Sequence, residues 1–275
     1  MRAITVVALW LCSAALHAKT PDLAARFRDL DGCVILHDLK HNTRVLQYGE
    51  ARCAQRLPPC STFKVPLALM SFDAGVLKDA STTFKWDGKK RWLTSWNADQ
   101  TAASWMKNSA LWVSQILTQR LGEAALKKYL ADFRYGTQDM SGGLQGAWLT
   151  IGPDDDPKLR ATLRISAQEQ IEFLSRMWRG QLRVAPRALE LTKQITLVEK
   201  SPKGTTLHGK TGTGSVGPRH DLRLGWFVAH LANASEEYVA VVSFTERRHR
   251  EPYDTYAGPE AREILKSILR ELGLW

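Results

Sequence analysis

Runs of apolar residues near the two ends of the chain have the length and composition of β-strands. Two of these runs lie close together near the N-terminus, and His41 and Asn42 between them suit the turn of a hairpin. Three more lie in the last third of the chain, where β-branched and aromatic residues are frequent. The predicted strands cover residues 32–39, 44–48, 207–213, 223–230 and 237–244.

The chain between these strands has the spacing of helices. Apolar residues recur every three or four positions, and Pro66 falls in the first turn of one such segment, where proline is tolerated. We therefore expect an α/β fold of the α+β type, in which N- and C-terminal strands share one antiparallel sheet flanked by helices, with a mainly helical insertion at about residues 75–195. The predicted helices cover residues 61–74, 102–121, 123–133, 166–178 and 259–272.

Residues 1–18 have the pattern of a secretory signal peptide. Arg2 precedes an apolar stretch at 3–16 that is too short to span a membrane, and Ala15 and Ala18 both suit cleavage. The remainder, residues 19–275, has the size of one large domain, and no other segment is apolar enough to span a membrane. We therefore expect an exported, periplasmic protein.

The net charge of +10, from 38 basic and 28 acidic residues, raises the question of nucleic-acid binding. The basic residues are scattered along the chain, and their one cluster, residues 247–250, lies in a predicted loop. This distribution indicates a solvated basic surface, so we expect neither a nucleic-acid partner nor a membrane span. The oligomeric state stays open.

Three cysteines remain once Cys12 leaves with the signal, which allows one disulfide and one free thiol. Cys53 and Cys60 enclose a short proline-containing loop, so we expect these two to be bonded. Cys33 lies in a predicted strand and suits a small core position. Neither the cysteine spacing nor the histidine pattern is that of a metal site, so no metal is expected.

The strongest candidate chemistry is Ser61-Thr62-Phe63-Lys64, followed far downstream by Lys210-Thr211-Gly212. A serine needs a base to become a nucleophile, and a lysine three residues later on a helix lies on the same face. The distant lysine and threonine offer a cation and a hydroxyl to an anionic substrate. Another Ser-x-x-Lys, at Ser104 and Lys107, lies within an amphipathic run and lacks a better-placed Lys-Thr-Gly.

Several further motifs share their order and spacing with one family. The whole set, over roughly residues 31–275, resembles the class D, oxacillinase-type, serine β-lactamases. This resemblance implies a serine β-lactamase and penicillin-binding transpeptidase-like fold, hydrolysis of β-lactam antibiotics, and antibiotic resistance. The additional motifs are Ser109-Ala110-Leu111, Tyr135-Gly136-Thr137-Gln138, Ala147-Trp148-Leu149, Leu163-Arg164-Ile165-Ser166 and Gly225-Trp226-Phe227.

The resemblance also implies residue roles. Ser61 attacks the β-lactam carbonyl, and Lys64 is its base. Burial lowers the pKa of a lysine, and in this family the neutral amine takes up carbon dioxide as a carbamate, which Trp148 would hold. No other cofactor is implied. Ser109 would relay a proton, the amides of Ser61 and Thr213 would form the oxyanion hole, and the remaining substrate-binding positions are Lys210, Thr211, Gly212, Thr213 and Leu111.

Two positions depart from the family pattern, because Leu111 replaces the usual valine and Thr137 the usual asparagine. These departures leave substrate range and turnover rate open. A Ser-x-Asn at Ser95 and Asn97 is an alternative to Ser109. Family members often bind the substrate carboxylate through an arginine, for which Arg247, Arg248, Arg250 and Arg262 are candidates.

Other penicillin-recognising proteins form the alternative classes. The chain has no Ser-Asp-Asn, no Glu-x-x-Leu-Asn and no Tyr-x-Asn, which argues against the other serine β-lactamase classes. A penicillin sensor or a transpeptidase-like domain shares the fold and motifs but is acylated without turnover. We expect small-molecule β-lactams as the partners in either case.

Overall fold

The computed structural model describes residues 20–150, 161–217, 219, 221–249 and 256–275. The predicted signal peptide at 1–18, the acidic segment at 152–157 and Arg250 lie outside the described residues. Within the described ranges, no helix is both long enough and apolar enough to cross a membrane.

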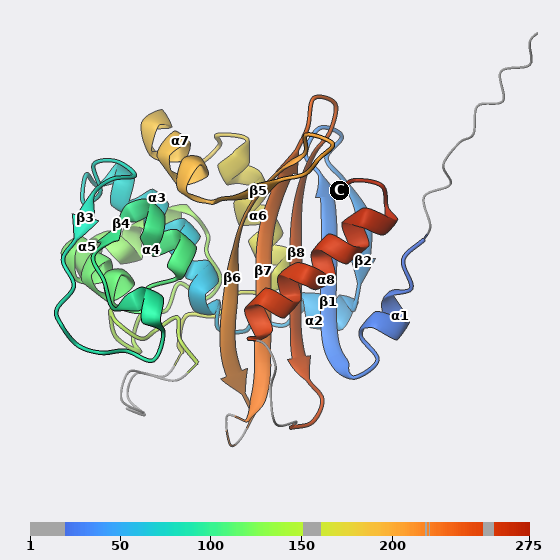
Figure 1. Ribbon diagram of the computed structural model, residues 1–275, viewed down its shortest axis with the longest axis horizontal. Helices are drawn as coiled ribbons and strands as arrows, with labels where there is room; N and C mark the ends of the chain where they lie inside the picture. The colour runs from blue at the N-terminus through green and yellow to red at the C-terminus, as the bar shows by residue number, and fades with distance from the viewer. Residues whose placement is uncertain (1–19, 151–160, 218, 220, 250–255) are drawn as a thin grey trace, which may run out of the picture.

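One six-stranded antiparallel sheet forms the centre of the molecule, with the order β2-β1-β8-β7-β6-β5 (Figure 1). The N-terminal strand β1 pairs along its whole length with the C-terminal strand β8, so the expectation of one shared sheet is confirmed. The short edge strand β5 was not predicted. The sheet strands are β1 (Leu30–Asp38), β2 (Thr43–Tyr48), β5 (Leu197–Lys200), β6 (Thr206–Val216), β7 (Leu222–Ala232) and β8 (Glu237–Glu246), and a separate pair is β3 (Thr83–Phe84) and β4 (Gln100–Thr101).

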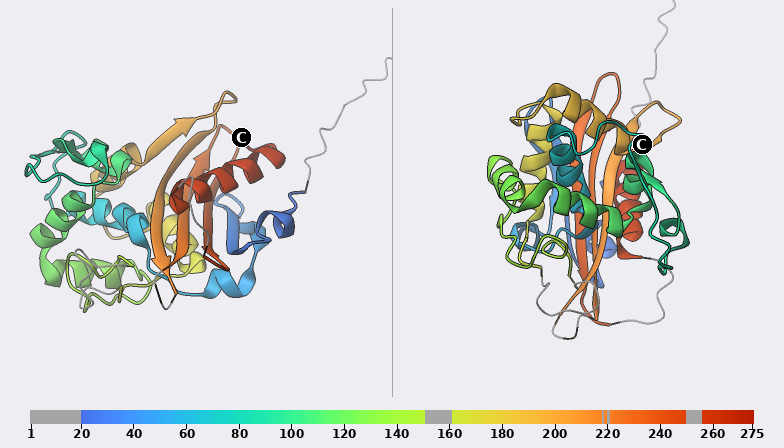
Figure 2. Two further views of the ribbon diagram at one scale, coloured as in Figure 1. Left: turned by 60° about the horizontal axis from the view of Figure 1, so that its bottom comes forward. Right: turned by 90° about the vertical axis from the view of Figure 1, so that its left-hand side faces the viewer.

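Helices cover both faces of this sheet (Figure 2). Helix α8 lies along one face, over β6, β7 and β8, and α6 packs on the other face against β8 and β1. The helical region between β2 and β5 extends from that second face. The helices are α1 (Leu23–Arg26), α2 (Glu50–Ala54), α3 (Lys64–Asp73), α4 (Ala102–Asn108), α5 (Leu111–Asp132), α6 (Ala167–Trp178), α7 (Pro186–Ile195) and α8 (Ala257–Glu271), with 3₁₀ turns η1 (Cys60–Phe63) and η2 (Thr94–Trp96).

Strand β7 is buried on both faces and separates two hydrophobic cores. Successive side chains of a strand point to opposite faces, so Phe227 and Ala229 belong to the core beneath α8, whereas Val228 belongs to the core shared with the helical region. The second of these cores also contains Trp105 and Trp148, which are fully buried. The helical insertion is therefore packed directly onto the sheet through one continuous core.

Two predicted helices differ from the structure in a way that matters for the site. The segment 61–74 starts as the 3₁₀ turn η1 and becomes α-helical only at Lys64. The segment 102–121 is interrupted at Ser109, whose φ of 59° is left-handed. This residue ends α4, and α5 begins at Leu111.

The predicted disulfide between Cys53 and Cys60 is wrong. Cys33 on β1 bonds to Cys53 on α2, with their Cα atoms 5.2 Å apart. Cys60 is a buried free thiol. Because Cys60 is fixed in η1, with its thiol directed at the Pro58 carbonyl at 3.6 Å, it is held in the core near β6 instead.

Candidate active site

The turn η1 brings Ser61 and Lys64 together. A 3₁₀ turn has three residues per turn, so side chains at positions i and i+3 eclipse one another. The Lys64 amine lies 3.3 Å from Ser61 Oγ, within hydrogen-bond distance. The sequence prediction that these two side chains share a face is confirmed, although a 3₁₀ turn produces the contact.

Lys64 is only 1% exposed, and its surroundings disfavour a positive charge. Burial is the main reason that the pKa of Lys64 lies well below its ordinary value. The positive charge of Lys210 lowers this pKa further, and Cys60 opposes the shift. Lys64 is therefore poised as a neutral amine beside a hydroxyl, the arrangement that a general base requires.

Trp148 packs against the same turn from the loop that precedes residue 151. Its ring stacks on Phe63 with centroids 5.1 Å apart, and its carbonyl accepts a 3.0 Å hydrogen bond from the Cys60 amide. The indole Nε1 is buried and has no hydrogen-bond partner among the residues that the structure describes. A buried donor without an acceptor is costly, so this N–H points to a missing acceptor in the site.

Strand β6 lies alongside η1 and carries the downstream motif. A Cβ atom added to Gly212 would lie 3.0 Å from the Pro59 carbonyl oxygen, so the close approach favours glycine there. Lys210 is buried, and its amine donates to the Thr211 carbonyl at 3.0 Å and to Thr211 Oγ1 at 3.2 Å. Burial, aided by the charge of Arg262, lowers the pKa of Lys210 to about 7.

Thr213 is anchored from the opposite face of the sheet. Its Oγ1 accepts a 2.9 Å hydrogen bond from the amide of Gly258, in the first turn of α8. The sequence contained no signal for this contact. It fixes the strand on the side that faces away from Ser61.

Ser109 lies at the junction between α4 and α5. Its amide donates to the Trp105 carbonyl, and the preceding residue, Asn108, accepts a 2.8 Å hydrogen bond from the indole of Trp96. Leu111 is the first residue of α5. It is partly buried and packs against the core that the sheet shares with the helical region.

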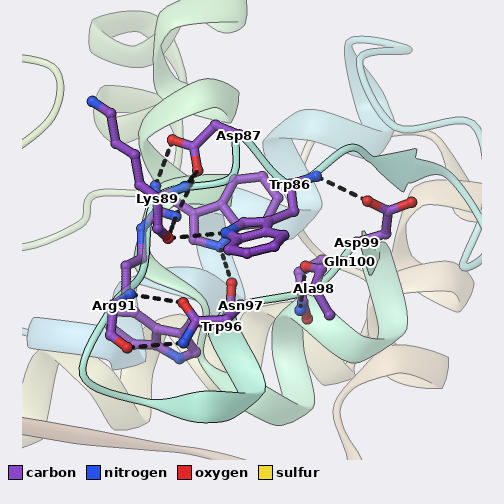
Figure 3. Close-up of polar contacts among 10 residues, drawn as sticks. Trp86, Asp87, Lys89, Arg91, Trp96, Asn97, Ala98, Asp99 and Gln100 are labelled. Carbon is purple, nitrogen blue, oxygen red and sulfur yellow. Dashed lines mark hydrogen bonds and ion pairs between the residues drawn. The ribbon is translucent and has the colours of Figure 1, made fainter.

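Two polar side chains of the alternative motifs form local contacts instead. Ser104 forms a capping box with Thr101 at the start of α4 and bonds to Gln100 at 3.0 Å. Figure 3 shows that the Asn97 amide bonds back to Arg91 instead of extending from its loop, with Arg91 N to Asn97 Oδ1 at 2.7 Å and Asn97 Nδ2 to Arg91 O at 2.9 Å. Asn97 therefore stabilises its own loop. This use of its amide argues against a functional Ser-x-Asn motif at Ser95.

A buried polar contact supports the nucleophile turn from behind. Gln170 on α6 donates to Thr62 Oγ1 at 3.1 Å and approaches the Tyr135 hydroxyl at 3.3 Å. Burial raises the pKa of Tyr135, so it stays a neutral phenol. The sequence motif containing Tyr135 was recognised, whereas the role of Gln170 in joining it to η1 was missed.

Thr137 uses its hydroxyl within the protein. Its Oγ1 donates to the Thr162 carbonyl at 2.9 Å and accepts from the Arg164 amide at 2.9 Å. The neighbouring Gly136 has a φ of 54°, and a Cβ there would lie 2.0 Å from the Arg164 carbonyl oxygen. Thr137 therefore joins two loop segments.

A cavity of about 340 Å³ adjoins Lys210. Lys107 and Arg262 also line this cavity, so three cationic side chains surround it. Among the candidate arginines, Arg262 is thus placed beside Lys210, whereas Arg247 and Arg248 follow the end of β8. Over the described ranges, the structure holds no group of three histidine, cysteine or acidic residues that could bind a metal ion.

Comparisons with known proteins agree with this geometry. The penicillin binding protein transpeptidase domain family matches residues 32–270. The β-lactamase OXA-1 of Escherichia coli is 38% identical over 226 residues, 80% of this chain and 78% of that protein. The probable β-lactamase YbxI of Bacillus subtilis is 34% identical over 94% of this chain and 87% of its own length. The structure of the class D β-lactamase BAT-2 is similar with a TM-score of 0.81 and 30% identity, covering 95% and 99% of the two chains.

Proposed function

The chain belongs to the penicillin-binding protein transpeptidase family and, within it, to the class D serine β-lactamases, and from this premise we propose how its residues hydrolyse β-lactam antibiotics. The observation that carries the proposal is the contact between Ser61 Oγ and the buried Lys64 amine at 3.3 Å. It supplies a nucleophile and a base in one turn of the chain. This activity confers resistance on a cell that produces the protein.

In the first half of the reaction, Ser61 Oγ attacks the carbonyl carbon of the β-lactam ring. The serine proton goes to the base at Lys64, the ring C–N bond breaks, and the ring nitrogen takes up a proton through Ser109. Backbone amides of Ser61 and Thr213 would stabilise the negative charge on the carbonyl oxygen. Water then attacks the ester with the same base and releases Ser61.

Lys64 meets the conditions for a carbamate. An unperturbed lysine is protonated up to about pH 10.4 and cannot react with carbon dioxide at neutral pH, whereas burial lowers the pKa of Lys64 and frees its amine. The unpartnered Trp148 Nε1 is a donor suited to a carbamate oxygen. Carbon dioxide bound to this amine would supply an anionic base, so the site would not need a separate glutamate.

Lys210 and Thr211 are proposed to bind the substrate carboxylate. The Lys210 amine has Thr211 Oγ1 at 3.2 Å, so an ammonium and a hydroxyl meet at one point of β6. Gly212 allows β6 to approach η1, the turn that carries Ser61, which supports this assignment. Leu111 would contribute an apolar wall. The predicted signal peptide supports a periplasmic location for the reaction.

Turnover of a chromogenic cephalosporin tests the proposal. We expect the purified protein to hydrolyse many equivalents, and Ser61→Ala to hydrolyse none above background. A matched control is Ser104→Ala, because Ser104 belongs to a helix cap in the same region; this variant should keep its activity. A burst that stops at one equivalent per protein, with a persistent adduct, would support the sensor alternative.

A further inference from the structure

The turn η1, which carries Ser61, packs against two glycines of β6 that flank Thr213. Gly212 and Gly214 occupy alternate positions of β6 and so face the same side of the sheet. A Cβ atom on Gly212 would lie 3.0 Å from the Pro59 carbonyl oxygen, and a Cβ atom on Gly214 would lie 2.7 Å from Cys60 Sγ. Residues 59 and 60 therefore set how closely η1 approaches the strand.

Thr213 lies between the contact of β6 with η1 and a second contact on the other face of the sheet. Its side chain accepts the 2.9 Å hydrogen bond from the Gly258 amide. The main chain at Thr213 thus has η1 on one side and the start of α8 on the other. The position of Thr213 relative to Ser61 therefore depends on the size of the side chains that lie between β6 and η1.

Cys60 has the character of a fixed spacer. It is buried and has a φ of 50°, which an L-residue adopts only when its surroundings impose it. Its amide is bonded to the Trp148 carbonyl at 3.0 Å and its thiol is directed at the Pro58 carbonyl. Burial raises the pKa of the Cys60 thiol to about 12, so the group stays a neutral packing atom.

Thr150 completes the layer. A Cβ atom on Gly214 would also lie 2.7 Å from Thr150 Cγ2, while Thr150 Oγ1 accepts a 3.1 Å hydrogen bond from the Ser215 amide. Any side chain at position 214 therefore meets two neighbours. A methyl group at this position would force one of these neighbours, or β6 itself, to shift.

We propose that Cys60 and Gly214 are a size-matched pair that sets the distance between the amides of Ser61 and Thr213. Cys60 is thereby a positioning residue for oxyanion stabilisation. The inference rests on the proposed function, because it presumes that these two amides bind the developing oxyanion. A bulkier residue at position 60 or at position 214 would move the amides of Ser61 and Thr213 apart.

Coupled substitutions test this pair. Gly214→Ala should lower kcat/KM for a cephalosporin by about 100-fold, the loss that a displacement of about 1 Å can cause. The affinity for a boronic acid, which forms a tetrahedral adduct resembling the transition state, should fall in parallel. Cys60→Ala alone should cost about threefold, and adding Cys60→Ala to Gly214→Ala should restore at least about tenfold in both measurements. Adding Thr150→Ser to this double variant should restore still more of kcat/KM and of boronate affinity.

Two further variants keep the test decisive. Cys60→Met adds bulk on the η1 side of the contact and leaves Gly214 in place. It should lower kcat/KM and boronate affinity together, even if Gly214→Ala fails to fold. Val242→Ala removes volume from the buried core beneath α8; it should lower the melting temperature and leave kcat/KM and boronate affinity unchanged.

Independent, multiplying effects at positions 60 and 214, or a loss of kcat/KM without loss of boronate affinity, would overturn the positioning role. Failure of the proposed function looks different, because the wild-type protein itself would then form no acyl adduct on Ser61.

Discussion

Lys210 lowers the pKa of Lys64, and both amines are buried in the same site. Two ammonium groups in a region of low dielectric repel each other, so protonation of one disfavours protonation of the other. This difference in pKa suits the roles that we propose for the two amines. Lys64 is driven toward the neutral form that a base requires, whereas Lys210, with a pKa of about 7, keeps part of the charge that an anionic substrate requires.

The first prediction is a bell-shaped pH profile of kcat/KM, a quantity that reports on the free enzyme. On the acidic side, activity should rise with pH as Lys64 loses its proton and becomes a base. On the alkaline side, activity should fall from about pH 7 upward, because Lys210 then loses its positive charge and binds a carboxylate less well. Initial rates at low substrate concentration across pH 5 to pH 9 would check both limbs.

Lys210→Arg is the matched variant for this profile. A guanidinium stays charged throughout this range, so the alkaline limb should move to higher pH while the acidic limb stays. An alkaline limb that is unaffected by the substitution would contradict the assignment of that limb to Lys210.

The second prediction concerns the unpartnered indole N–H of Trp148. Trp148→Phe keeps an aromatic ring against Phe63 but removes the donor, so the proposed carbamate should be retained less well. Deacylation should slow by at least about tenfold, more than acylation, because the acyl-enzyme then lacks a base for its water. Pre-steady-state kinetics with and without added bicarbonate would separate the two steps.

Added bicarbonate should restore much of the lost deacylation rate in this variant. Wild-type enzyme in degassed, mildly acidic buffer should lose activity in the same way, because carbamates decompose when the amine is protonated. Full activity after degassing, without a carbon-13 carbamate signal that depends on Lys64, would mean that the neutral amine is the base.

The third prediction concerns the bond between Cys33 and Cys53. Protein comprising residues 19–275 should show one titratable thiol when unfolded without reductant, and almost none when folded, because Cys60 is buried. Replacing both bonded cysteines by serine should lower the free energy of unfolding by about 3 kcal/mol, as expected for a loop of about 20 residues. Urea unfolding would measure the loss, and a disulfide-linked peptide containing Cys60 would contradict the pairing.

The fourth prediction concerns Thr137, which differs from the usual family residue. Thr137→Val leaves the Arg164 amide and the Thr162 carbonyl without their partner. We expect a loss of about 1–3 kcal/mol in the free energy of unfolding, whereas Thr137→Ser, which retains the hydroxyl, should lose less than half of this. Equal losses in the two variants would show that the hydroxyl is not what the loops require.

The sequence predicted five of the six strands of the central sheet, because the composition of a strand is a local property. Apolar runs at both ends of the chain predicted the strands that become β1 and β8, and the helical stretch between them indicated that both belong to one sheet. The edge strand β5 was missed because Leu197 and Val198 are exposed and carry no pattern of burial. The break at Ser109 was missed because a left-handed residue other than glycine leaves no compositional signal.

The contact between the two main candidate site residues was predicted, whereas the geometry around them was predicted only in part. The spacing of Ser61 and Lys64 fixed their contact, since it depends on one turn. The bond from Cys33 to Cys53 depends on how α2 packs against β1, which loop length does not reveal. The contact of Cys60 with Gly214 likewise joins segments far apart in sequence, and only the fold brings them together.

Mass mapping of the acyl-enzyme tests the central claim most directly. The protein is mixed with a slowly hydrolysed β-lactam, quenched in acid, digested and analysed by peptide mass spectrometry. We expect one adduct per molecule, on the peptide that contains Ser61, and no adduct in Ser61→Ala. An adduct on Ser95 or Ser104, or turnover without any adduct, would contradict the account.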